Sequence, residues 1–251
     1  MKMVSPFNST HWNIKILLIP PLLMALIFIS WLSPLFRPFW DRIDQMTFIY
    51  LNGWIKNSVY WQNFWAFTNH KAMDWIHDAI MFSFFYFNIT KASTELKSRK
   101  IAEVIVVLCF MTLILILVNN FFIHTPRKSP TEIDPSAFRL SSVIEWMKVK
   151  DHSKKSFPGD HGTTAILFTC FVFYLMGWKK GIGSIFYAIF FTLPRLISGA
   201  HWTTDILIGS ALIAIGTTSL IMGSPLGFLT ISYLEQRIDV MRDKGKSQCQ
   251  R

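Results

Sequence analysis

Long apolar stretches alternate with polar segments along this chain, and six of them reach the length of a membrane span, alone or with a few flanking residues. A helix crosses the hydrocarbon core of a bilayer with about 20 mostly apolar residues, within a range of about 17–25. We therefore expect an all-α integral membrane bundle of six transmembrane helices, formed as a single domain over residues 1–251. The expected spans are residues 14–36, 73–89, 101–123, 161–178, 182–198 and 203–222, followed by a tail over 223–251.

The segment between the first two expected spans has a different pattern, in which tryptophans alternate with polar residues. It runs from Phe39 to Asn69. Amphipathic segments rich in tryptophan lie in the membrane interface with their polar face toward water. We expect one or two short interfacial helices here. The residues that produce this pattern are Trp40, Trp54, Trp61 and Trp65, interrupted by Asp41, Asp44, Asn52 and Lys56.

Basic residues orient the bundle. An even number of spans puts both termini on one side, together with the loop Thr90–Lys100 and the turn that contains Lys179 and Lys180. These regions and the tail are rich in lysine and arginine, and short basic loops stay in the cytoplasm. We therefore expect a multi-pass membrane protein with both termini cytoplasmic. The other loops, including residues 124–161, then face the non-cytoplasmic side.

Composition agrees with a membrane protein and removes one class of partner. Hydrophobic residues make up 51% of the chain and charged residues only 16%, whereas soluble domains are about 25% charged. A net charge of +10 would suggest nucleic acid in a soluble protein. In a membrane protein the basic loops set the topology and contact anionic lipid, so we expect a bilayer and no nucleic acid.

Three polar segments at the ends of expected spans carry the candidate chemistry. They are Arg127–Pro130, Ser156–Gly162 and Arg195–Asp205, and the expected topology puts all three at the non-cytoplasmic face. A single histidine or arginine at a span end would simply cap a helix or extend to the headgroups. Charges within a membrane cost about 2.5–3.5 kcal/mol at a helix centre, so several of them at one level indicate a functional site.

Spacing suggests roles for the histidines. His201 and Asp205 are four residues apart, so they share a face if the sixth helix begins near His201. The carboxylate would then accept a hydrogen bond from one ring nitrogen and leave the other as a nucleophile. His161 would protonate the departing oxygen as a general acid.

The surrounding residues suit a phosphate group better than a metal ion. Guanidinium groups grip non-bridging phosphate oxygens, and glycine lets backbone amides approach a phosphate closely. A metal site built from His161, His201 and Asp205 is the alternative. The two neighbouring guanidinium groups and Lys128 would repel a divalent metal ion, so we expect no metal and no cofactor. The predicted phosphate-binding residues are Arg127, Arg195, Lys128, Ser129, Gly159 and Asp160.

These segments resemble the three-part signature of the type-2 phosphatidic acid phosphatase superfamily of membrane phosphatases. The third part, Arg-x5-His-x3-Asp, is matched fully from Arg195 to Asp205. The resemblance implies a metal-independent enzyme that transfers lipid phosphate through a phosphohistidine at His201.

The signature departs from the family pattern at three places. Pro194 stands where a serine is usual, and Pro158-Gly159-Asp160-His161 stands for Pro-Ser-Gly-His. Asn120 occupies the position of a phosphate-binding lysine, for which Lys128, Lys154 or Lys155 are candidate substitutes.

The departures resemble one subgroup, the inner-membrane enzymes that transfer phosphate from undecaprenyl pyrophosphate to the 1-phosphate of lipid A. The resemblance implies a lipid donor, a lipid acceptor and a place in the bacterial inner membrane, with the site facing the periplasm. No obligate protein partner is evident from the sequence. It extends from the first to the sixth expected span, and its most similar segments are Thr68–Asp74, Arg127–Pro130, Ser156–Gly162 and Gly199–Trp202.

Two other functions stay open at this point. A hydrolase acting on undecaprenyl pyrophosphate or another lipid phosphate would use the same histidine, with water in place of the acceptor. A transporter would carry ionisable residues deep within its spans and paired broken helices, whereas the charges here gather at span ends. The sequence leaves the acceptor, the acyl-chain preference and the oligomeric state undecided.

Overall fold

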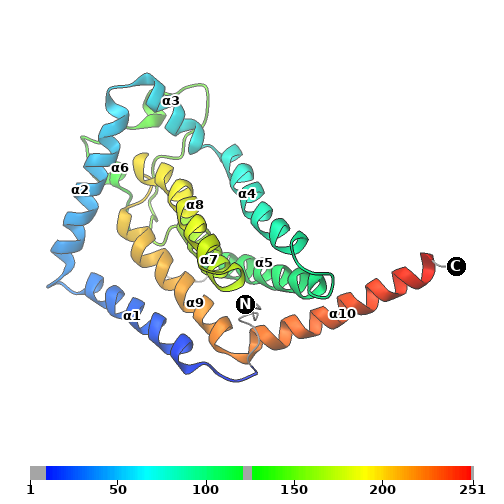
Figure 1. Ribbon diagram of the computed structural model, residues 1–251. Helices are drawn as coiled ribbons and strands as arrows, with labels where there is room; N and C mark the ends of the chain where they lie inside the picture. Colours follow the sequence, from blue (N-terminus) through cyan, green and yellow to red (C-terminus); the bar gives the residue numbers. More distant parts are fainter. Residues whose placement is uncertain (1–9, 121–125, 250–251) are drawn as a thin grey trace.

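Figure 1 shows a computed structural model of the chain, which describes residues 10–120 and 126–249, with side chains for 10–118 and 126–244. Every regular element in this part is a helix, as expected. The elements are α1 (Ile14–Leu32), α2 (Arg37–Lys56), α3 (Val59–Thr68), α4 (Lys71–Thr90), α5 (Lys97–Asn120), α6 (Pro130–Ile133), η1 (Leu140–Ser142), α7 (Asp160–Met176), α8 (Trp178–Ile197), η2 (Asp205–Ser210), α9 (Ala211–Gly223) and α10 (Pro225–Cys249).

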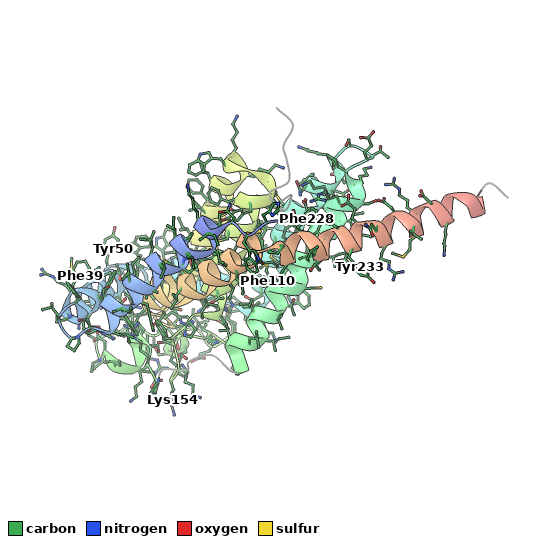
Figure 2. The ribbon with its side chains drawn as sticks, turned by 90° about the horizontal axis from the view of Figure 1, so that it is seen from below. Phe39, Tyr50, Phe110, Lys154, Phe228 and Tyr233 are labelled. Atoms are coloured by element: carbon green, nitrogen blue, oxygen red, sulfur yellow. The ribbon has the colours of Figure 1, made fainter. Side chains whose placement is uncertain are left out.

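Helix α7 occupies the centre of the bundle, packed against α5, α8 and α9. Its apolar side chains, among them the fully buried Phe168 and Phe171, form the middle of the largest core cluster. Helix α1 lies along α9, and the first part of α10 lies along α5. The rest of α10 extends away from the bundle (Figures 1 and 2).

Four helical stretches are long and apolar enough to cross a membrane: 14–32, 97–118, 178–197 and 205–223. They identify the chain as a membrane protein. The other two expected spans are helical too, but α7 has 17 residues, and α4 is not among the four. Helix α4 is less apolar because Lys71, Asp74 and Asp78 lie in its first half. Six spans therefore remain a prediction, and residues 121–123 of the third lie outside the described residues.

The tryptophan-rich segment forms two helices, α2 and α3, and the first is longer than expected, with 20 residues. Helix α2 buries one polar stripe against the bundle. The side-chain amide of Asn52 donates to the carbonyl oxygens of Phe138 and Ile197, at 3.0 and 3.1 Å. Its oxygen accepts from the Phe138 N–H at 2.8 Å. These bonds fasten α2 to the end of α8 and to the loop that follows α6.

The helices that carry the three motifs converge at one end of the bundle. Helix α7 and the π-helical segment η2 begin there, and α8 ends there (Figure 1). At the opposite end the Asn13 N–H donates to the carbonyl of Gly223 at 2.8 Å, joining the start of α1 to the end of α9. The candidate site therefore lies at the end where α2 and the loop 126–159 cover the bundle.

Candidate active site

Two loop segments bring the first motif beside the second. The Ser129 N–H donates to the Ser153 carbonyl at 2.9 Å, and the Ser156 N–H donates to the Arg127 carbonyl at 2.8 Å. The Ser129 hydroxyl is buried and accepts from the Ser153 N–H at 2.9 Å. Ser129 thus shapes the loop from inside, and its predicted contact with phosphate stays a prediction.

A glycine at the end of α8 directs the third motif into the site. Gly199 has φ of 74°, a left-handed conformation that ends many helices and that glycine adopts without strain. A Cβ at this position would lie 2.6 Å from the Thr131 side chain. The N–H groups of Ala200 and His201 both return to the Arg195 carbonyl, at 3.0 and 3.3 Å. This tight turn carries His201 over the start of α7.

His201 has the protonation pattern of a nucleophile, although its hydrogen-bond acceptor was not predicted. Its Nδ1 lies 2.8 Å from the Ser156 carbonyl oxygen and 3.6 Å from Oδ2 of Asp205. A carbonyl oxygen only accepts, so Nδ1 carries the proton and Nε2 of the neutral ring keeps its lone pair. The ring is mostly buried, with the residue 7% exposed.

The helix that was expected to begin near His201 starts slightly later, so the two residues do not share a helical face. Asp205 instead forms a reciprocal cap, in which its Oδ2 accepts from the Trp202 N–H at 2.8 Å and its own N–H donates to the Trp202 carbonyl at 3.1 Å. Such a cap fixes the first turn of a helix. It holds the buried Asp205 carboxylate near His201 and leads into η2, a π-helical segment of a kind common at functional sites.

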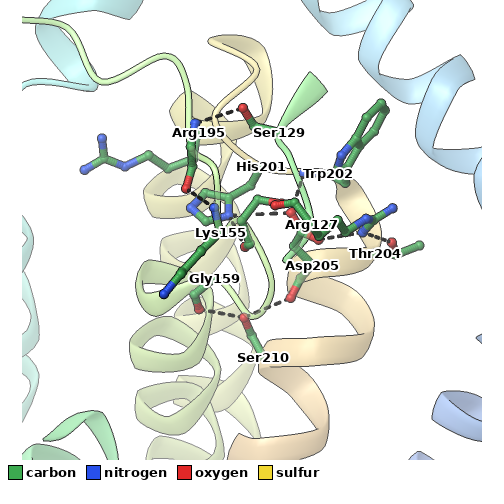
Figure 3. Close-up of polar contacts among 12 residues, drawn as sticks. Arg127, Ser129, Lys155, Gly159, Arg195, His201, Trp202, Thr204, Asp205 and Ser210 are labelled. Atoms are coloured by element: carbon green, nitrogen blue, oxygen red, sulfur yellow. Dashed lines mark hydrogen bonds and ion pairs between the residues drawn. The ribbon is translucent and has the colours of Figure 1, made fainter. Parts of the chain in front are cut away.

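Arg127 joins this cluster through carboxylates (Figure 3). Its Nη1 lies 2.5 Å from Oδ1 of Asp205 and 2.8 Å from the Thr204 hydroxyl. Its Nη2 lies 2.6 Å from Oδ2 of Asp44. The guanidinium sits 5.3 and 5.4 Å from the rings of Trp31 and Trp202. Phosphate binding by Arg127 stays a prediction, since both terminal nitrogens are engaged with protein groups.

Asp44 belongs to the site although sequence analysis gave it no role. It is 1% exposed, and its two oxygens accept from the Thr204 N–H at 2.9 Å and the Thr204 hydroxyl at 2.7 Å. Burial raises the pKa of this carboxyl, while Arg127 and Thr204 act against the rise. An acidic residue on the inward face of an amphipathic helix is the signal that could have identified it.

The second histidine lies among an arginine and two carboxylates. Nδ1 of His161 is 2.7 Å from Oδ1 of Asp160. Its Nε2 is 2.7 Å from Nη2 of Arg195 and 3.3 Å from Oδ1 of Asp74. The structure therefore brings the predicted acid and one predicted phosphate-binding arginine into contact. The Asp160 carboxylate also accepts from the backbone N–H of His161 at 2.8 Å. The Asp160 side chain therefore orients the His161 ring.

The start of α4 supports this histidine and its arginine. Nη1 of Arg195 donates to the carbonyl of Asn69 at 3.0 Å and to its side-chain oxygen. Nδ2 of Asn69 in turn donates to the Lys150 carbonyl at 2.9 Å. Asp74 lies 3.6 Å from Nη2 of Arg195. Asn69 and Asp74 come from the segment Thr68–Asp74, to which sequence similarity alone had pointed.

Gly159 joins the two histidine clusters. A Cβ added there would lie 3.5 Å from Nδ1 of His201 and 3.5 Å from the Ser210 hydroxyl. That hydroxyl donates to the Gly159 carbonyl at 2.7 Å. Both distances are ordinary van der Waals contacts, so packing alone does not require a glycine here, and phosphate binding at Gly159 stays a prediction.

The three lysines proposed to replace the family lysine lie on the protein surface near the site. The side chains of Lys128, Lys154 and Lys155 are exposed, and Figure 2 shows Lys154 projecting from the edge of the molecule. Lys128 contributes its carbonyl oxygen, which accepts from the Trp202 indole at 2.8 Å. The Asn120 side chain lies outside the described residues, so substitution for the family lysine stays a prediction.

An apolar groove of about 240 Å³ borders the site between α1 and α9. Phe157 and Pro158, which directly precede Gly159, form its end nearest the histidines. Helix α9 contributes Gly216, at which an added Cβ would meet nothing within 4 Å. The groove is lined by Phe28, Phe157, Pro158, Gly209, Leu212, Ile213, Gly216 and Thr217.

Within residues 10–120 and 126–249, no three His, Cys, Asp or Glu side chains form a group that could hold a metal ion. His161 and His201 bind to different partners, and the carboxylate of Asp205 faces Arg127. The Asp205 carboxylate is thus paired with a guanidinium, and phosphate binding without a metal ion stays a prediction.

Sequence comparison shows which known proteins the chain is similar to. Residues 120–226 match the sequence profile of the PAP2 superfamily, and this range contains all three motifs. The chain is 28% identical over 217 residues to lipid A 1-diphosphate synthase of Escherichia coli (strain K12), covering 84% of this chain and 89% of that protein. No solved structure matches the chain. The part of this membrane protein that carries the three motifs is therefore similar to the PAP2 superfamily, and the similarity to this relative extends over most of the chain.

Proposed function

We propose that this protein transfers a phosphoryl group between membrane lipids through a phosphohistidine at His201, from undecaprenyl pyrophosphate to the 1-phosphate of lipid A. The observation that carries the proposal is the hydrogen bond from Nδ1 of His201 to the Ser156 carbonyl, at 2.8 Å. In the neutral imidazole this bond puts the lone pair on Nε2, within a site that also holds His161 and Arg195. The name of the Escherichia coli relative, lipid A 1-diphosphate synthase, supports the acceptor.

In the first half-reaction, Nε2 of His201 attacks the terminal phosphorus of the donor. The N–P bond forms as the bridging P–O bond breaks, and His161 gives its proton to the departing oxygen. The His201 ring then carries a positive charge. The Ser156 carbonyl and the Asp205 carboxylate stabilise that charge, because both face Nδ1.

In the second half-reaction, an oxygen of the acceptor phosphate attacks the phosphorus and His201 leaves. His161 takes up the proton that the acceptor loses, which restores the enzyme. A phosphoanhydride is broken and another is formed, so the transfer needs no further energy source. Arg195 would hold the non-bridging oxygens beside His161, and the exposed lysines Lys128, Lys154 and Lys155 would attract the acceptor.

The apolar groove between α1 and α9 suits the hydrocarbon chain of a lipid substrate. Its walls are two helices long and apolar enough to span a membrane, and its inner end is formed by the residues that precede Gly159. A chain in the groove would keep its phosphate next to His201. The groove therefore supports a lipid substrate over a water-soluble phosphate.

One feature favours a second candidate, hydrolysis of the same donor. The side chains of Asp74 and Asp160 are 37% and 41% exposed beside His161, so water can reach this side of the site. Water would then attack the phosphohistidine in place of the acceptor, with the same residues in the same roles.

An assay with purified protein in detergent distinguishes phosphate transfer to lipid A from hydrolysis of the donor. Donor labelled in its terminal phosphate is incubated with and without lipid A, and the products are separated as lipid and free phosphate. We expect labelled diphosphorylated lipid to form and free phosphate to appear slowly. Release of free phosphate at one rate in both mixtures, with no diphosphorylated lipid, would identify a phosphatase.

A further inference from the structure

We propose that Asp44, on the peripheral helix α2, is a positioning residue for the reaction, because it neutralises Arg127 and so leaves the negative charge of Asp205 to His201. This inference rests on the proposed phosphohistidine function. It assigns a role to a residue outside the three motifs.

The contacts form one continuous path from α2 to the nucleophile. Oδ2 of Asp44 lies 2.6 Å from Nη2 of Arg127, and Nη1 of the same guanidinium lies 2.5 Å from Oδ1 of Asp205. The other oxygen of Asp205 faces Nδ1 of His201 at 3.6 Å. The side chains of Asp44, Arg127 and Asp205 are 2%, 12% and 0% exposed, so water screens these charges little.

The net charge of Asp44, Arg127 and Asp205 determines how this cluster acts on His201. Two carboxylates and one guanidinium leave this cluster with a net charge of −1 beside His201. The ring becomes cationic when it takes the phosphoryl group, so the negative cluster stabilises the intermediate and the transition state before it. Without the charge of Asp44 the cluster is neutral, because the positive charge of Arg127 cancels the negative charge of Asp205. The cationic ring of His201 then loses this stabilisation.

Thr204 fixes the geometry of this arrangement. Its N–H and hydroxyl both donate to Asp44, at 2.9 and 2.7 Å, and its hydroxyl also lies 2.8 Å from Nη1 of Arg127. Thr204 directly precedes Asp205, so the position of α2 is coupled to that of the catalytic carboxylate. Asn52, two turns further along α2, fastens the same face of the helix.

A purely structural role is the alternative, in which Asp44 only attaches α2 to the first turn of the last span. The two roles differ in their dependence on charge. Removing Asp44 and Arg127 together restores a net charge of −1 through Asp205 alone. An electrostatic role therefore predicts recovery in the double variant, whereas a structural role predicts a further loss, because two more buried contacts are missing.

The test compares Asp44→Asn, Arg127→Gln and the double variant as purified full-length proteins, with the labelled lipid donor and lipid A. Asp41→Asn is the matched control, since Asp41 lies on the same helix but pairs only with Arg37, at the surface. We expect Asp44→Asn to lower kcat on the order of tenfold with an unchanged KM for the donor, as loss of charge stabilisation in the transition state predicts. The double variant should exceed Asp44→Asn in kcat, because its net charge of −1 equals that of the parent cluster, and Asp41→Asn should match the parent protein.

Thermal unfolding of each variant separates folding from catalysis. If Asp44→Asn does not fold, the double variant is compared with the parent protein, since both clusters carry a net charge of −1 and the double variant should keep most of the parent's kcat. A double variant no more active than Asp44→Asn, a double variant far below the parent protein where Asp44→Asn does not fold, or Asp44→Asn activity equal to that of the Asp41→Asn control would overturn the inference. An inactive parent protein would instead contradict the proposed function.

Discussion

At the scale of single residues, the two histidines differ in what surrounds them. Nδ1 of His201 faces a neutral carbonyl at 2.8 Å and a carboxylate at 3.6 Å, which orients the ring and leaves Nε2 free. His161 lies within 3.3 Å of Asp160, Asp74 and Arg195; the Arg195 guanidinium only donates, so Nε2 of His161 accepts from it and Nδ1 carries the proton toward Asp160. The first environment suits a nucleophile, and the acid role of His161 stays a prediction.

Alanine substitutions test these roles separately. We expect His201→Ala to lower turnover most, because no other group near the phosphorus replaces Nε2. His161→Ala should lower kcat by about 100- to 10,000-fold, the range for loss of a general acid, and Asp205→Ala should also lower it strongly. Steady-state kinetics with the labelled donor measure all three, and substantial turnover in His201→Ala would exclude it as the nucleophile.

The residues of the site suit an anion without a metal ion. We therefore expect full activity after dialysis against EDTA, because arginine and lysine side chains supply the positive charge that phosphoryl transfer needs. The measurement is the initial rate before and after dialysis. Loss of activity with EDTA and its return with added zinc would favour the metal alternative.

At the scale of elements, the sequence predicted which segments are helical better than it predicted how they meet. Apolar runs located the helices that became α1, α4, α5, α7 and α8, because helix burial in a membrane depends on composition. The contact between His201 and Asp205 was expected from a helical face, but a cap and a π-helical segment produce it. The roles of Asp44 and Asn69 depend on contacts with residues more than a hundred positions away, which periodicity does not encode.

The groove between α1 and α9 permits a test at this scale. We expect Gly216→Leu to fill it and to raise KM for a long-chain donor by about tenfold, since each displaced methylene costs ~0.8 kcal/mol. A short-chain donor should be affected little. Gly183→Leu on α8, where an added Cβ also meets nothing within 4 Å, is the control. Equal KM values for the long-chain donor in both variants would show that its chain lies elsewhere.

At the scale of the whole molecule, one end of the bundle carries the three motifs and the other carries α10. The motif-bearing ends of α7, α8 and η2 converge, whereas the start of α5 and the start of α10 lie at the opposite end (Figure 1). The side of the membrane that each end faces stays a prediction from the basic loops. Composition alone could not decide whether α4 and α7 cross the membrane, because one carries charges and the other is short.

Reporter fusions test the sidedness. A reporter that is active only in the periplasm should be silent when fused after Ser98 and active when fused after Lys150, because Ser98 lies at the start of α5 and Lys150 lies in the loop over the site. A reporter active only in the cytoplasm, fused at the same positions, provides the control. The opposite pattern would put the chemistry in the cytoplasm.

The most direct test of the whole account is to trap the phosphorylated enzyme. Protein mixed with donor labelled in its terminal phosphate is quenched in alkali, in which phosphohistidine survives, and the labelled peptide is identified. We predict one labelled residue, His201, with label that is lost in acid and that moves to lipid A when the acceptor is added before quenching. Label on another residue, or turnover without any labelled enzyme in a protein whose His201 is intact, would contradict the account.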